Sequence, residues 1–164
     1  MPEIVFVGTG DAFGSGGRRN TAILLRERGQ SLLLDCGPTT AAGLKQLGID
    51  PREIDAIAIS HFHGDHVAGV PFLLLDYVYE TPRREPLAIY GPPTIRERVE
   101  RITRAFEFGA EREAGYTLEY REFDAGKPID AGAFRITPLD AHHAAATHPH
   151  MLRVEAGGRS LVFS

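Results

Sequence analysis

"SHFHGDH", residues 60–66, places three histidines and one aspartate within six consecutive positions. The sequence contains seven histidines, and the other four lie in "HHAAATHPH", residues 142–150. Two such tight clusters are hard to explain as scattered surface side chains. They predict two halves of one site.

An apolar run, "IDAIAIS" at residues 54–60, leads into the first cluster and predicts a strand. Residues two apart on an extended strand end point the same way, so the imidazoles of His61 and His63 can converge on one cation. We expect Gly64 to permit a tight turn that a residue with a Cβ would resist. Asp65 and His66 leave this turn on another side, where they can hold a second cation roughly 3.5–4 Å from the first. The alternative is a histidine-rich loop without a ligand.

Alternating strands and helices surround the two clusters. Short apolar runs between glycines, prolines and aspartates predict strands at 3–8, 21–28, 31–37, 54–60, 86–91, 116–123, 133–141, 151–157 and 159–164. Capping residues and helical periodicity predict helices at 39–49, from about 66 to 78, and at 92–108. Residues 1–164 are therefore expected to form one α/β domain.

The charge balance gives no support for a nonspecific nucleic-acid or membrane partner. The net charge is −4, and the 92–108 segment interleaves its arginines with glutamates. A solvated helix face is therefore the favoured interpretation of these arginines. No apolar run approaches the roughly 18 residues of a membrane span, and the N-terminus lacks the features of a signal peptide. With a single cysteine, Cys36, these features predict a cytoplasmic protein without internal disulfides.

A glycine-rich segment, "GTGDAFGSGG" at residues 8–17, follows the first predicted strand. Its glycine spacing does not match the dinucleotide-binding fingerprint, and a strand follows where the phosphate-binding helix should begin. We interpret it as a strand-to-strand loop that can still border the site.

The motif H-x-H-x-D-H, here "HFHGDH" after the strand at 54–60, resembles the signature of the metallo-β-lactamase superfamily. Residues 7–38, "VGTGDAFGSGGRRNTAILLRERGQSLLLDCGP", are similar in order and spacing to the opening of its ribonuclease Z-like branch. The resemblance implies an αββα sandwich, in which two sheets lie face to face with helices outside and metals at one sheet edge.

The same resemblance assigns roles to residues outside the motif. Asp35 would support the metal-bound histidines without binding metal, although a simple turn aspartate is the alternative. The third histidine of the first metal would be His143, chosen by family spacing, with His142 as the alternative. Because adjacent strand residues point to opposite faces, we expect only one of them to face the metals.

The remaining site residues receive less specific expectations. His148 and His150 are expected on the surface of the loop before the next strand. Cys36 is expected to be a small buried residue rather than a nucleophile. The resemblance further calls for a bridging aspartate directly after the strand at 159–164 and for a final histidine. Since the sequence ends at Ser164, we expect it to be the N-terminal portion of the domain and to be inactive alone.

The resemblance implies a metal-dependent hydrolase that uses a metal-bridging hydroxide, with two zinc ions favoured and manganese or iron as alternatives. Phosphodiesterase activity is the first expectation. The tRNA-processing members carry a long arm after the third histidine, but only 21 residues follow His143 here. We therefore favour a small phosphodiester or ester substrate over nucleic acid. The alternatives are a lactone or thioester hydrolase and a noncatalytic metal-binding or interaction domain. A homodimer is compatible with all of these functions.

Overall fold

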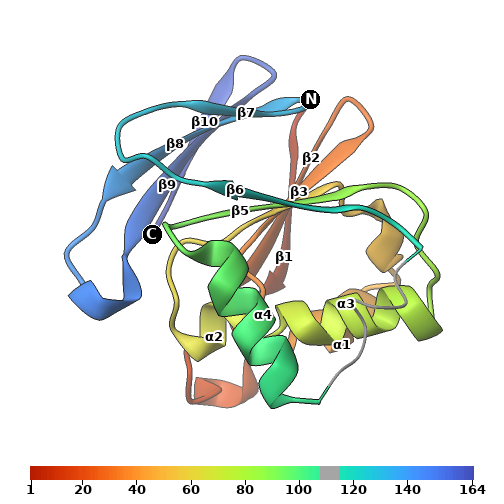
Figure 1. Cartoon of the computed structure of the whole chain (residues 1–164). Coiled ribbons are helices and arrows are strands. Elements are labelled where there is room, and N and C mark those ends of the chain that lie inside the picture. Colours follow the sequence, from red (N-terminus) through yellow and green to blue (C-terminus); the bar gives the residue numbers. More distant parts are fainter. Residues whose placement is uncertain (108–114) are drawn as a thin grey trace.

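The computed structural model describes residues 1–107 and 115–164, which form a pair of β-sheets packed face to face (Figure 1). The strand order in the larger sheet is β1-β2-β3-β4-β5-β6, formed by Glu3–Gly8, Ala22–Glu27, Gln30–Leu34, Ala56–Ala58, Leu87–Gly91 and Leu118–Glu122. The order in the smaller sheet is β10-β9-β8-β7, formed by Arg159–Phe163, His150–Ala156, Phe134–Asp140 and Ile129–Ala131.

The larger sheet is mixed. Its first three strands are antiparallel, and β3 to β6 are parallel neighbours whose connections contain the helices. Both faces of its central strands are buried, so these strands read as continuous apolar runs rather than alternating ones. In β2, for example, Leu24 packs on the helical side, whereas Ile23 and Leu25 face the smaller sheet.

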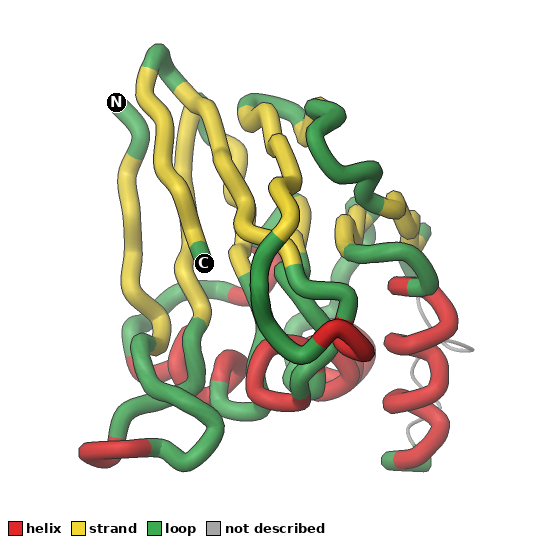
Figure 2. The backbone as a smooth tube through the Cα atoms, turned by 90° about the vertical axis from the view of Figure 1, so that its left-hand side faces the viewer, coloured by secondary structure: helices red, strands yellow, loops and turns green. Residues whose placement is uncertain are grey.

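The helices cover one face of the larger sheet. They are α1 Thr40–Gln46, α2 Gly64–Val67, α3 Val70–Tyr79 and α4 Ile95–Ala105, joined by short 3-10 helices at Ser15–Gly17, Pro51–Glu53 and Ala145–Thr147. Leu44, Leu73 and Ile95 are fully buried in one cluster with the sheet. Figure 2 shows the strands of both sheets running alongside one another, with the helices below and at one side.

The second core lies between the two sheets. Leu32 and Leu34 of β3 share a buried cluster with Ile136 of β8 and Leu152 of β9. The order helices, sheet, sheet corresponds to the αββ portion of the expected αββα sandwich. The α/β class and the face-to-face sheets are thus confirmed.

Two elements differ from the sequence expectation. The helix expected from about 66 to 78 is divided into α2 and α3 at Gly69, whose N–H donates to the Cys36 carbonyl at 2.8 Å. A Cβ on Gly69 would lie 1.9 Å from the carbonyl oxygen of Gly37, so only glycine fits this approach. Strand β7 was not among the predicted strands. The helix expected at 92–108 is observed as α4, Ile95–Ala105. The last residue of the expected range, residue 108, lies outside the described residues.

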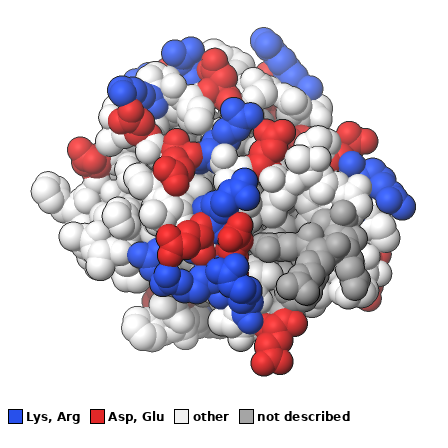
Figure 3. All heavy atoms as spheres, viewed as in Figure 1, with Lys and Arg blue, Asp and Glu red and all other residues white. Residues whose placement is uncertain are grey.

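Three of the four arginines of α4 pair with glutamates on the same helix, whereas the Arg98 guanidinium lies 5.2 Å from the centre of the Phe62 ring. Arg101 Nη2 lies 2.6 Å from Glu97 Oε1, and Arg104 Nη1 lies 3.6 Å from Glu100 Oε2. On the face drawn in Figure 3, basic and acidic side chains are interleaved. This pattern agrees with the expected solvated helix face. In the described ranges, no helix combines the length and apolarity that a membrane crossing requires.

Candidate metal centre

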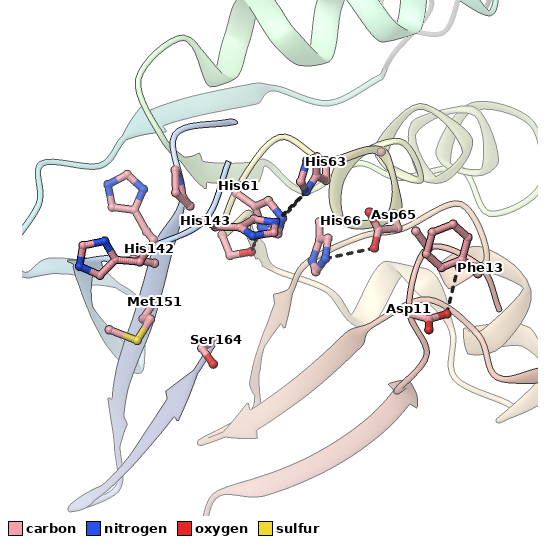
Figure 4. Close-up of a pocket in the computed structure, with 16 residues that line it drawn as sticks. Asp11, Phe13, His61, His63, Asp65, His66, His142, His143, Met151 and Ser164 are labelled. Carbon is pink, nitrogen blue, oxygen red and sulfur yellow. Dashed lines mark hydrogen bonds and ion pairs between the residues drawn. The ribbon is translucent and has the colours of Figure 1, made fainter. Parts of the chain in front are cut away.

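Three imidazoles from two distant segments meet beyond the ends of β4 and β8 (Figure 4). His61 Nε2 lies 3.2 Å from His63 Nδ1, and His143 Nε2 lies 3.0 Å from the same His63 nitrogen. Two nitrogens that are each about 2.0–2.1 Å from one tetrahedral zinc ion would lie roughly 3.3 Å apart. The three nitrogens therefore have a spacing that suits ligands of a single ion.

We expected the turn after His63 to require glycine at position 64, but it does not. Gly64 is the first residue of α2, its φ lies outside the left-handed region, and a Cβ there would meet no atom within 4 Å. That expectation is wrong. Instead, His63 has extended backbone angles (φ −68°, ψ 145°) directly before the helix, so the start of α2 itself turns the chain.

Asp65 and His66 occupy the first turn of α2 and form a second donor pair. His66 Nε2 lies 3.3 Å from Asp65 Oδ2. The His66 ring centroid is 4.1 Å from that of His61, so this pair lies beside the three imidazoles. His61 and His63 thus belong to the group of three imidazoles, and Asp65 and His66 form a second pair of polar side chains beside it.

Asp35 lies beneath the histidines and is fully buried. One of its oxygens accepts a hydrogen bond from the Ser60 N–H at 2.7 Å, and the other accepts from the Ser60 hydroxyl at 2.8 Å and lies 2.5 Å from His66 Nδ1. Asp35 has φ 59°, a left-handed conformation that is uncommon outside glycine and concentrates at functional sites. Asp35 also lies close enough to His61 and His66 to share an ion with them, but protein groups engage both of its oxygens.

Ser60 connects Asp35 to His61 by hydrogen bonds. Its hydroxyl donates to Asp35, and it lies 2.9 Å from His61 Nδ1, from which it can accept a hydrogen bond. The Nδ1 atoms of His61 and His66 are thus both occupied by protein partners, and their Nε2 lone pairs are left for an ion. Hydrogen bonds of this kind fix the tautomer of metal-binding histidines. The donor set therefore fits a metal centre.

The electrostatics of the site also favour neutral imidazole at His61. Burial, followed by repulsion from the neighbouring histidines, lowers the pKa of His61 to about 4. Burial acts against protonation of His66 as well, but its hydrogen bond to Asp35 and the charges of Asp35 and Asp65 outweigh this and raise its pKa. Burial raises the pKa of Asp35 against the opposing hydrogen bonds. Histidine binds metals in the neutral form, so His61 is prepared for this role.

The segment after β3 holds α2 in place by close backbone contact. The Cys36 N–H donates to the His66 carbonyl at 2.7 Å, and a Cβ on Gly37 would lie 2.1 Å from the carbonyl oxygen of Asp65. Glycine is therefore required at position 37. Cys36 itself is fully buried, and burial raises the pKa of its thiol to about 12. It is a buried small residue, as expected, and not a nucleophile.

The second histidine cluster is joined to the first by backbone hydrogen bonds. The Phe62 N–H donates to the Thr147 carbonyl at 3.0 Å, and the His150 N–H donates to the Ser60 carbonyl at 3.1 Å. His142 and His143 lie in the loop after β8, not on a strand, so our alternation argument for choosing between them was wrong in its premise. The loop nevertheless places His143, and not His142, within the group of three imidazoles.

His148 and His150 lie close to the site without joining either donor group. His148 ends the 3-10 helix Ala145–Thr147, whereas His150 is the first residue of β9 rather than a loop residue as we expected. Both line a cavity of about 560 Å³. This cavity shares His142, His143 and His150 with the cavity that contains the metal centre.

The cavity that contains the metal centre has a volume of about 660 Å³. Besides the histidines, its lining includes Met151 and Ser164 from the smaller sheet and Asp11, Ala12 and Phe13 from the loop between β1 and β2. The sequence indicated only that this glycine-rich loop can border the site. It did not single out Ser60 or Phe13, because neither residue type signals a metal site without its surroundings.

The chain is similar to proteins of one family over nearly its whole length. The family model described as "Anti-Pycsar protein Apyc1" matches residues 2–159. A ribonuclease Z of Methanothermobacter thermautotrophicus is 35% identical over 144 residues, which cover 88% of this chain and 45% of that relative. The chain thus spans less than half the length of this curated relative.

Solved structures give the same picture of the fold. The human tRNase Z, short form (ELAC1), superposes with a TM-score of 0.80 at 25% identity, covering 99% of this chain and 68% of that one. The metallo-β-lactamase fold protein YhfI from Bacillus subtilis superposes with a TM-score of 0.76 at 23% identity, covering 98% of this chain and 60% of that one. The chain belongs to the family described as Anti-Pycsar protein Apyc1, a ribonuclease Z-like family of the metallo-β-lactamase superfamily.

Proposed function

We propose that this protein is a metal-dependent hydrolase that cleaves phosphodiester bonds in small substrates. The observation that carries the proposal is the trio of imidazole nitrogens, 3.0 and 3.2 Å apart, beside a second pair of donors. Its relatives named ribonuclease Z and tRNase Z support phosphodiester cleavage as the reaction.

The two donor groups divide between two ions in this proposal. His61, His63 and His143 would hold the first ion, and Asp65 with His66 would contribute to the second. What bound ions would supply is ionisation of water near neutral pH and polarisation of the oxygens at the scissile bond. Zinc is our first choice because imidazole and carboxylate donors suit it, and manganese or iron are the alternatives with the same donors.

Asp35 and Ser60 would orient the metal-binding imidazoles without binding an ion themselves. Asp35 and Ser60 hold the Nδ1 atoms of His61 and His66, so that the opposite nitrogens point toward the cavity. The buried Asp35 carboxylate also balances positive charge that accumulates at the centre. Since Asp65 lies in the first turn of α2 and contributes to the cavity lining, its carboxylate is also placed to accept a proton from the reacting groups.

A small substrate is favoured by the surface charge and by the cavity. The net charge is −4, and basic side chains on the face in Figure 3 alternate with acidic ones. Binding to long nucleic acids depends on many simultaneous contacts of basic residues with phosphates. A cavity of about 660 Å³ is within the range of small-molecule sites.

We further propose that residues 1–164 all belong to one metallo-β-lactamase-like domain and that the protein works in the cytoplasm. The sheets share a continuous buried core, which supports the first point. The second rests on the single buried cysteine.

A comparison of substrates at equal metal loading tests the proposed reaction. We expect the full-length, zinc-loaded protein to hydrolyse bis(p-nitrophenyl) phosphate faster than a lactone, a thioester or precursor tRNA, with little dependence on salt because few phosphates are contacted. Strong lactone or thioester turnover without phosphodiester turnover would show an acyl hydrolase. Efficient precursor tRNA cleavage would show that nucleic acid is the substrate, and a metal-loaded protein inert to all four would indicate a noncatalytic domain.

A further inference from the structure

Phe13 is an exposed phenylalanine at the rim of the cavity that contains the metal centre. Its side chain is 92% exposed, although it belongs to the lining of that cavity. In Figure 4, Phe13 lies beyond Asp65, at the opposite end of the site from His142 and Met151. A single exposed apolar ring needs no explanation on an ordinary surface, but Phe13 belongs to the wall of this cavity, where a bound substrate can cover it.

The backbone that carries Phe13 is held in a defined turn. The Asp11 carboxylate accepts hydrogen bonds from the N–H groups of Phe13 at 3.1 Å and Ser15 at 3.0 Å, and from the Ser15 hydroxyl at 2.7 Å. Gly14, directly after Phe13, has φ 65°, a left-handed conformation that glycine adopts without strain. The turn therefore fixes the point from which the ring projects.

The two arms of the loop are also packed tightly at its base. The Gly10 N–H donates to the Arg19 carbonyl at 2.6 Å, and the Thr21 hydroxyl donates to the Gly10 carbonyl at 3.0 Å. A Cβ on Gly10 would lie 2.7 Å from the Arg18 carbonyl oxygen, so the arms approach as closely as backbone allows. A loop built in this way has little backbone conformational entropy left to lose when a ligand contacts Phe13.

We propose that Phe13 is a specificity-determining residue, whose ring stacks against a flat unsaturated ring carried by one ester group of the substrate. The inference rests on the proposed function, because it assumes that a phosphodiester occupies the metal centre. A phosphodiester carries an ester group on each side of phosphorus. With its phosphate at the donor groups, one ester group would extend past Asp65 to Phe13 and the other toward Met151. Stacking of a base on an aromatic side chain is worth about tenfold or more in affinity.

Binding of two phosphonates tests this role without relying on turnover. Phenylphosphonate and methylphosphonate carry the same anionic group, and only the first has a ring. By calorimetry with zinc-loaded protein, we expect Phe13→Ala to weaken phenylphosphonate about tenfold and to leave methylphosphonate within about twofold of the original protein. Phe13→Tyr should retain the preference for phenylphosphonate, whereas Phe13→Leu, which is apolar but not flat, should lose most of it.

Phe6 offers a matched control, since it is 62% exposed on β1 and does not belong to the cavity lining. Phe6→Ala should leave both phosphonates unchanged. Equal weakening of both phosphonates by Phe13→Ala, no weakening of either, or full retention of phenylphosphonate binding by Phe13→Leu would overturn the inference. The hydrolysis assay on bis(p-nitrophenyl) phosphate reports separately on the proposed function. A protein that binds phenylphosphonate through Phe13 but cleaves no phosphodiester would contradict only the proposed function.

Discussion

Replacing His63 with alanine is expected to lower zinc affinity by at least about 100-fold and to reduce phosphodiester hydrolysis by a similar factor. His63 Nδ1 is the central nitrogen of the trio, 3.2 Å from His61 Nε2 and 3.0 Å from His143 Nε2. Loss of an orienting partner alone typically costs 10–100-fold in metal affinity, and loss of a direct ligand costs more. Competition with a chromogenic chelator measures the affinity, and steady-state kinetics measure the hydrolysis.

The fold itself should tolerate His63→Ala. The His63 side chain is only partly buried, so we expect the free energy of unfolding of the metal-free protein to change by less than about 1 kcal/mol. Chemical denaturation with and without zinc separates the two effects. A variant that keeps its zinc affinity and its activity would show that the ion, if one binds, lies elsewhere.

The neighbours His142 and His143 should behave very differently when each is replaced by alanine. We expect His143→Ala to remove more than about nine-tenths of the activity, because it opens the three-nitrogen site, and His142→Ala to retain at least about a tenth. Both side chains are exposed and lie in the same loop, so each variant serves as the control for the other. Activity at saturating zinc measures the difference. The reverse outcome would mean that His142 is the third ligand.

Much of the site could be predicted because its chemistry is local in the sequence. His61, His63, Asp65 and His66 lie within six residues, and neighbouring positions on an extended segment or a first helical turn must stay close in space. Most strands were predictable for a similar reason, since short apolar runs between turn residues predict strands. These features depend on residues a few positions apart. The arrangement of the strands in two sheets was expected only from the family resemblance.

The remaining features depend on contacts between distant segments. The orientation of His66 requires Asp35, 31 positions away, in a left-handed conformation that no local pattern demands. The break between α2 and α3 follows from the close approach of Gly69 to Gly37. Phe13 lies at the cavity only because contacts between the two arms of its loop place it there. The role of Gly64 was misjudged because a glycine in a motif suggested backbone strain, where the helix start was sufficient.

Diffraction from zinc-loaded crystals at the zinc absorption edge tests the central claim most directly, because the anomalous signal locates the ion itself. We expect the strongest peak at bonding distance from His61 Nε2, His63 Nδ1 and His143 Nε2, with a second peak beside Asp65 and His66. The same crystal should show Asp35 still bound to His66 and not to an ion. Zinc peaks away from these nitrogens, with the three imidazoles left without an ion, would contradict the account.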